Sequence, residues 1–178
     1  EEQVRNGWRF LLKLQNRDGS FVQEGGDQDR AYSQGLAMIA LCEIYGMTKS
    51  SLFREPAQRA VNYAVDIQAA EGGWRYQPRI DTDTSVTGWY VMGLQSALMA
   101  GLDVPSPTFQ RVSEYLDAVA LDSGSLYKYQ PSRQGYSLAM TAEALLCRAY
   151  LGWGQKDARR LRGVKDLLGG PIAWEYRD

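Results

Sequence analysis

The stretch RAVNYAVDIQAAEGGW, residues 59–74, decides the fold because two variants of it occur elsewhere in the chain. One is RNGWRFLLKLQNRDGSF at 5–21, and the other is RVSEYLDAVALDSGSL at 111–126. Their glycines Gly19, Gly72 and Gly124 lie 53 and 52 residues apart. Self-similarity at a fixed period is typical of proteins built from stacked supersecondary units.

The apolar runs downstream of these stretches keep the same period. Leu41, Leu94 and Leu146 are again 53 and 52 residues apart. We therefore predict that the chain is a single repeat domain, residues 1–178. Its units lie near 1–54, 55–106, 107–156 and, in truncated form, 157–178.

Each unit has two halves of different character. In the first half, apolar residues recur at i, i+3/i+4 and i+7, which predicts an amphipathic helix with one solvent-exposed face. The second half is apolar nearly all round, as in GWYVMGLQSALMAGL at 88–102, so other elements must cover it. A turn that contains glycine joins the halves, and strand patterns are scarce. The pattern predicts an all-α protein of helical hairpins, each with an outer amphipathic helix and an inner buried helix.

The composition is that of an ordinary globular domain and excludes several partner classes. The chain has 178 residues, 44% of them hydrophobic and 23% charged, with a formal net charge of -1. It offers no basic field for nucleic acid and no polybasic segment for a membrane surface. Polar residues and glycines interrupt the longest apolar run, 86–102, which indicates a buried helix and no membrane span. We expect a soluble protein, with the cytoplasm favoured.

Histidine is absent from the chain, and cysteine occurs only twice. Without histidine the commonest general base, the Ser-His and Cys-His nucleophile systems and nearly every usual catalytic zinc set are missing. Cys42 and Cys147 lie within apolar helical patterns, where a reduced thiol behaves as a small hydrophobic group. The sequence thus predicts no metal site and no cofactor.

The repeated stretches resemble the QW motif of triterpene cyclases such as squalene-hopene cyclase. The motif combines a basic, a small, an aromatic and an aliphatic residue with Gln-x3-Gly-x-aromatic. The second copy carries it most clearly, at Arg59, Ala60, Tyr63, Ala64, Gln68, Gly72 and Trp74. The first copy, with one additional residue, has Arg5, Gly7, Phe10, Leu11, Gln15, Gly19 and Phe21. The third keeps Arg111, Tyr115, Leu116 and Gly124 but has Ala120 for the Gln and Leu126 for the aromatic residue.

This resemblance covers nearly the whole chain and implies an α/α-toroid, a ring of helical hairpins with the inner helices around a central cavity. The superfamily includes terpenoid cyclases, protein prenyltransferase β-subunits and thioester domains. In the motif, the Gln is expected to satisfy backbone groups at helix ends while the aromatic residue packs on the turn. A six-hairpin ring of this period needs roughly 310 residues, so we expect an incomplete toroid of about three and a quarter repeats. Either the remainder of a longer polypeptide or a second copy completes the ring.

Two of the chemistries that the resemblance implies lack their residues. Prenyltransferases use a zinc site of Asp, Cys and His, and this chain has no histidine. Thioester domains need Cys-Gly-Glu-Gln, whereas the cysteines here lie in CEIYG and CRAYL. The third chemistry, that of class II terpene cyclases, uses the middle Asp of a D-x-D-D motif to protonate an alkene.

The segment DTDTS, residues 81–85, allows two alignments with that motif. Counted from its own start, it has Asp83 as the acid and Thr84 in place of the last Asp. Counted back from the following apolar run, it has Ser85 there, so the proton donor is absent, and helical register favours this alignment. Such residues are also typical of a helix N-terminus, where they accept hydrogen bonds from free backbone N–H groups. We predict a helix cap, with Asp83 and Asp81 as the candidate acids of the catalytic alternative.

Four aromatic residues at or near the starts of the predicted inner helices are candidates for lining a ligand cavity. They are Trp89, Tyr90, Tyr32 and Tyr136. Core packing is the alternative role for these side chains. Glu43, Glu143 and Arg148 are polar positions on inner helices, which face either the central cavity or a neighbouring hairpin.

We therefore expect a non-catalytic prenyltransferase/squalene-cyclase-type repeat module that binds a protein segment or an apolar ligand as part of a larger protein. The alternative is a class II terpene-cyclase-like enzyme that protonates a polyprenyl substrate. Neither interpretation predicts a nucleic-acid partner.

Overall fold

The computed structural model of the protein describes residues 2–21 and 26–170, and within these ranges the chain is all-α, as predicted. The helices are α1 Glu2–Leu14, α2 Asp27–Thr48, α3 Ser51–Asp66, α4 Thr84–Ala100, α5 Ser106–Val119, α6 Leu138–Tyr150 and α7 Ala158–Gly169. The strands β1 Ala120–Leu121 and β2 Leu126–Tyr127 form a short antiparallel pair around a 3₁₀ turn at Asp122–Gly124. They replace part of the predicted loop between α5 and α6.

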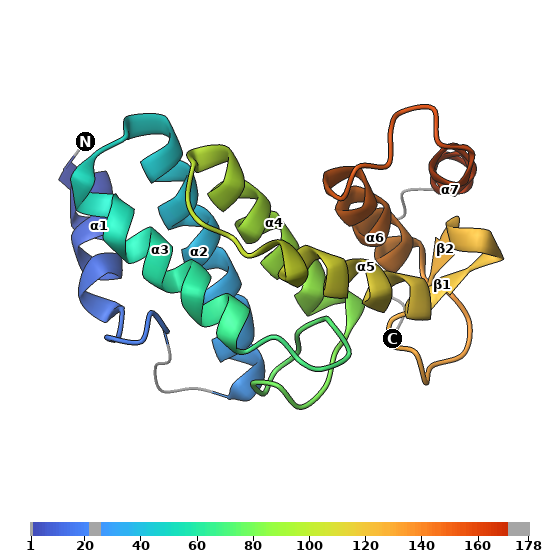
Figure 1. Ribbon diagram of the computed structural model, residues 1–178, viewed down its shortest axis with the longest axis horizontal. Helices are drawn as coiled ribbons and strands as arrows, with labels where there is room; N and C mark the ends of the chain where they lie inside the picture. Colours follow the sequence, from blue (N-terminus) through green and yellow to red (C-terminus); the bar gives the residue numbers. More distant parts are fainter. Residues whose placement is uncertain (1, 22–25, 171–178) are drawn as a thin grey trace.

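Along the long axis of the molecule, α1, α3 and α2 lie at one end, α4 follows them, and α6 and α7 lie toward the other end (Figure 1). The three predicted inner helices form a row, since α4 packs against both α2 and α6. The amphipathic helix α3 packs on α2 and α4, and α5 packs on α4. The centre of the row is fully buried from solvent, since Met38, Leu41, Val91 and Leu94 have no exposed surface. Burial of this apolar surface is the main stabilising contribution to the fold.

In the first two segments, a glutamine side chain connects the turn to the outer helix that follows it. The Gln68 amide donates to the Gly72 carbonyl at 2.7 Å and to the Thr108 carbonyl at 3.1 Å. The Gln68 carbonyl oxygen accepts a hydrogen bond from Arg111 Nε at 2.8 Å. The buried Gln68 side chain thus joins the end of α3, the turn after it and α5.

Gln15 makes the same connections one segment earlier. Its amide donates to the carbonyls of Gly19 and Pro56, at 3.4 and 2.8 Å, and its oxygen accepts from Arg59 at 2.8 Å. The motif arginine of one segment therefore binds the motif glutamine of the segment before it. The predicted role of the Gln, to satisfy backbone carbonyls beside helix ends, is confirmed at both positions, whereas Ala120 in the third segment has no side chain to do so.

A second recurring hydrogen bond links each turn to its inner helix and reveals an error in our sequence alignment. The backbone N–H of the turn aromatic donates to a polar side chain on the inner helix. These pairs are Phe21 with Gln34 Oε1, Trp74 with Thr87 Oγ1 and Tyr127 with Thr141 Oγ1, at 2.8, 3.0 and 3.1 Å. In the third segment the turn aromatic is therefore Tyr127, and the assignment of Leu126 to this position is wrong.

The third inner helix is also shifted relative to the predicted register. Leu41 and Leu94 are fully buried, but Leu146 is 41% exposed. The segment from Gly124 to Thr141 is two residues longer than its counterpart in the second unit, so later positions no longer follow the 52-residue spacing. The residue of α6 that corresponds to Leu94 is the buried Arg148, which donates to the hydroxyl of Tyr127 at 3.2 Å.

The turn glycine Gly72 allows the turn to approach the next outer helix closely. Its φ is +97°, and a Cβ at this position would lie 2.0 Å from the carbonyl oxygen of Arg111. Gly101, the C-cap of α4, has a similar positive φ of +79°, but a Cβ there would have no neighbour within 4 Å. An alanine at either position would strain the backbone, but only an alanine at Gly72 would also collide with the next helix. Comparing the two substitutions therefore separates the free-energy cost of the positive φ from the cost of the collision.

We expect Gly72→Ala to lower the free energy of unfolding by about 3 kcal/mol or more, because the helix backbone cannot yield as a side chain would. Gly101→Ala, the matched control, is expected to cost about 1 kcal/mol from its positive φ alone. Urea unfolding followed by circular dichroism measures both values. Equal losses for the two variants would contradict the close contact with Arg111.

Candidate functional site

Asp83 is the N-cap of α4 and is fully buried. Its Oδ1 accepts a hydrogen bond from the Val86 N–H at 2.7 Å. Its Oδ2 accepts from the Tyr129 hydroxyl at 2.9 Å and from Arg75 Nε at 3.2 Å. The predicted helix cap is confirmed for Asp83.

The surroundings of Asp83 act on its pKa in opposite directions. Burial raises the pKa above its ordinary value, whereas the Val86 N–H, the Tyr129 hydroxyl and the Arg75 guanidinium favour the ionised form. All three partners donate hydrogen bonds to the carboxylate. Asp83 is therefore suited to hold the start of α4, Tyr129 and Arg75 in place as a hydrogen-bond acceptor. It does not orient a proton toward a substrate, as an acid catalyst requires.

Asp81 lies on the outer side of the same cluster. It forms an ion pair with Arg75, and its side chain is 41% exposed. The Arg75 guanidinium lies 5.0 Å from the centre of the Tyr76 ring, and the Tyr76 hydroxyl is 3.5 Å from that of Tyr129. We call Arg75, Tyr76, Asp81, Asp83 and Tyr129 the Asp83 cluster.

Glu143, on α6, is a half-buried acid close to the Asp83 cluster. It packs over Gly88 of α4, where a Cβ would lie 2.1 Å from Glu143 Oε1. Burial, and secondly the charge of Asp83, raise the pKa of Glu143 to about 8. At neutral pH this side chain is therefore mostly an uncharged carboxylic acid between two inner helices.

A groove of 590 Å³ crosses the inner helices. We call it the methionine groove, because Met47, Met92 and Met99 line it together with Trp89. The remaining lining residues are Ile39, Cys42, Glu43, Gly46, Gln95, Ser96, Ala100 and Tyr150. Apolar side chains dominate the surface, and a few polar groups, including the Glu43–Ser96 hydrogen bond of 3.3 Å, interrupt it. This combination is typical of sites for small apolar ligands and for apolar faces of proteins.

The four predicted ligand-binding aromatics do not lie together. Trp89 lines the methionine groove, whereas Tyr90 is buried and stacked on Trp74 with ring centres 5.2 Å apart. The Tyr32 hydroxyl lies 3.2 Å from Ser85 Oγ near the start of α4, and Tyr136 is 56% exposed in the loop before α6.

The other polar positions on the inner helices face different ways. Glu43 is exposed and lines the groove. Arg148 is buried and points toward its own outer helix, α5, where it forms an ion pair with Asp117. Cys42 and Cys147 lie in the core as free thiols, as predicted, and burial raises the pKa of each to about 12.

The methionines and the two tyrosines of the Asp83 cluster were not among the predicted site residues. Met92 and Met99 are seven positions apart on one predicted inner helix, a spacing that indicates a shared face. Tyr76 and Tyr129 are separated by 53 residues, which matches the period predicted from the sequence. Both signals were present in the sequence.

Within residues 2–21 and 26–170, no group of three or more His, Cys, Asp or Glu side chains is arranged to hold a metal ion. No helix in the same part of the chain is long and apolar enough to cross a bilayer. Comparison with known proteins finds no matching family model, no matching curated protein and no matching solved structure.

The raised pKa of Glu143 makes stability depend on pH. The folded state holds the Glu143 proton up to about pH 8, whereas the unfolded chain releases it near the ordinary value of 4.5. The folded state therefore binds more protons across this window, and its stability falls as pH rises through it. We expect Glu143→Gln to flatten this dependence and to be more stable than the wild type above pH 8.

Urea unfolding at intervals between pH 5 and pH 9 measures the effect. Glu43→Gln, which neutralises an exposed acid on α2, serves as the matched control and should leave the slope unchanged. An unaltered pH dependence in Glu143→Gln would show that this acid is ionised in the folded state.

Proposed function

We propose that the protein is a non-catalytic module of prenyltransferase/squalene-cyclase-type repeats, an incomplete α/α-toroid that belongs to a larger assembly. In this proposal the methionine groove binds an apolar ligand or the apolar face of a protein segment. The groove carries the proposal, because it combines an open apolar surface with a few polar groups on the inner helices.

Contacts between residues one repeat apart support the repeat architecture. The pairs Tyr32–Ser85, Glu43–Ser96 and Tyr76–Tyr129 are each in contact, and each is separated by 53 residues. Units that stack in register bring equivalent positions together in this way. The remainder of a longer polypeptide or a second copy of the chain completes the ring in this proposal.

The chemistry of the groove supports an adaptable apolar ligand. Methionine side chains are flexible and polarisable, and they repack around ligands of different shape. Trp89 adds a large rigid surface beside them. The carboxylate of Glu43 and the amide of Gln95 at the same surface can orient a polar end group.

Equilibrium binding of farnesol, a linear apolar alcohol, tests the groove directly. We expect saturable binding to the wild type and a loss of at least about tenfold in Met92→Lys, because the variant introduces an unpaired charge into the apolar surface. Leu52→Lys, at an exposed apolar position on α3 away from the groove, is the matched control and should bind normally.

Equal binding by the two variants would contradict the assignment of the groove. If the wild type does not bind farnesol but binds an amphipathic helical peptide, and Met92→Lys weakens that binding, the occupant is a protein segment. Absence of both interactions would remove the proposed function.

The alternative, a class II terpene-cyclase-like enzyme, has weaker support, because the Asp83 carboxylate caps α4 and accepts hydrogen bonds with both oxygens. We expect Asp83→Ala to lose about 2 kcal/mol of stability as a cap and hydrogen-bond partner. Asp81→Ala, at an exposed ion pair, should lose less than about 1 kcal/mol. Incubation of the wild type with squalene should yield no cyclic product, and an Asp83-dependent product would establish the enzyme instead.

A further inference from the structure

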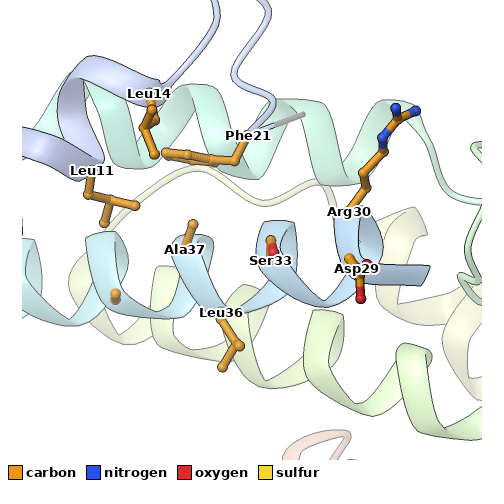
Figure 2. A pocket seen from close by; sticks show the side chains of 9 residues that line it. Leu11, Leu14, Phe21, Asp29, Arg30, Ser33, Leu36 and Ala37 are labelled. Atoms are coloured by element: carbon orange, nitrogen blue, oxygen red, sulfur yellow. The ribbon is translucent and has the colours of Figure 1, made fainter. Parts of the chain in front are cut away.

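The first hairpin has an open apolar groove on the side of α2 that faces away from α4. Six of the residues that line it are Leu11, Leu14, Phe21, Ser33, Leu36 and Ala37, and its volume is 420 Å³. Figure 2 shows Leu14 and Phe21 on one side of this space and Ala37 of α2 on the other. We call it the head groove.

In the second segment, the equivalent place is filled. The counterparts of Ala37 and Phe21, 53 residues later, are Tyr90 and Trp74, and both are buried. The inner helix α2 covers them there, since a Cβ on Gly35 would lie 3.2 Å from the Cβ of Trp89 and 3.8 Å from the Tyr90 ring. The head groove is thus the position that the preceding inner helix occupies in the next segment.

The opposite end of the row presents the matching surface. Four residues on α6, which we call the tail stripe, are exposed and lie on one helix face: Ala139, Ala142, Leu146 and Tyr150. In the register of the turn hydrogen bonds, their counterparts on α2 are Tyr32, Gly35, Ile39 and Glu43. Each of these α2 residues approaches α4.

We propose that the tail stripe of one copy packs into the head groove of a second copy, so that the row of inner helices continues across the boundary between chains. The proposal rests on the proposed repeat architecture. Both surfaces are largely apolar, with Asp29 and Arg30 at one end of the head groove. Both are present on every copy, so one copy can supply the stripe that the groove of another receives. Ala142 is a small residue at the position of Gly35 and Gly88, both of which lie against the next inner helix.

The contact is heterologous, since it joins different surfaces of the two copies. Each copy supplies three inner helices within the described residues, α2, α4 and α6. If the rotation between copies closes after two, the assembly is a closed ring of two chains. If it does not close, the same contact produces longer oligomers.

Sedimentation equilibrium of the full chain between about 1 and 500 µM tests the contact. We expect the wild type to exceed the monomer mass of 20.0 kDa, with two copies as the first associated species. Leu36→Lys in the head groove and Leu146→Glu in the tail stripe should each weaken association by roughly 100-fold or more, because each places a charge in an apolar contact. Leu52→Lys on α3 is the matched control and should associate like the wild type.

Mixing the two charged variants distinguishes this arrangement from a symmetric one. The tail of Leu36→Lys and the head of Leu146→Glu are both intact, so an equimolar mixture should recover association that neither variant shows alone. A head-to-head or tail-to-tail contact permits no such recovery, and this result would overturn the proposal. A wild type that remains monomeric throughout, or association that neither variant weakens, would also overturn it.

The variants also separate this inference from the proposed ligand site. Neither Leu36 nor Leu146 lines the methionine groove. Circular dichroism confirms that each variant is folded before its mass is interpreted. Farnesol binding by a wild type that stays monomeric would show that the groove proposal stands while the contact between copies fails.

Discussion

The close contact of the turns at Gly19 and Gly72 with the outer helices that follow them is the constraint on which the rest of the structure depends. At Gly72 the backbone leaves no room for a side chain against Arg111, and Gln68 bonds to both sides of the contact. Because the turn also bonds to its own inner helix through Thr87, the contact determines where that helix lies relative to the next hairpin. Local hydrogen bonds thereby determine the long-range spacing of the inner helices.

The hairpins of outer and inner helices could be predicted from the sequence, because helical periodicity and glycine turns are local signals. The register of the third unit could not be. Two additional residues lie between Gly124 and Thr141, yet Leu146 still falls near the expected spacing and has the expected chemistry. A leucine at the correct interval does not reveal that its face is exposed. Likewise, an inner helix that is apolar all round does not indicate which of its residues border a groove, so Met92 was overlooked.

The two acids near the start of α4 and on α6 show how surroundings determine the role of a carboxyl group. Asp83 is more deeply buried than Glu143, yet it is surrounded by an N–H, a hydroxyl and a guanidinium that compensate its charge. Glu143 lies over Gly88, where burial and the nearby Asp83 charge raise its pKa and favour its protonated form. The sequence identified the acidic segment around Asp83, but only the fold brings Glu143 beside it.

The proposed continuation of the row across two copies bears on where a ligand would bind. Within one chain, the methionine groove forms where α4 presents Trp89 and Ala100 beside α2. At a junction between copies, their counterparts on α2 are Leu36 and Met47, and the facing helix is α6 with Leu146. The junction therefore lacks the tryptophan and has a less rigid wall. Since a rigid aromatic surface loses little conformational entropy when a ligand binds, we expect the groove within each chain to be the stronger of the two proposed sites, and the proposed assembly would add copies of that site without creating an equivalent one between them.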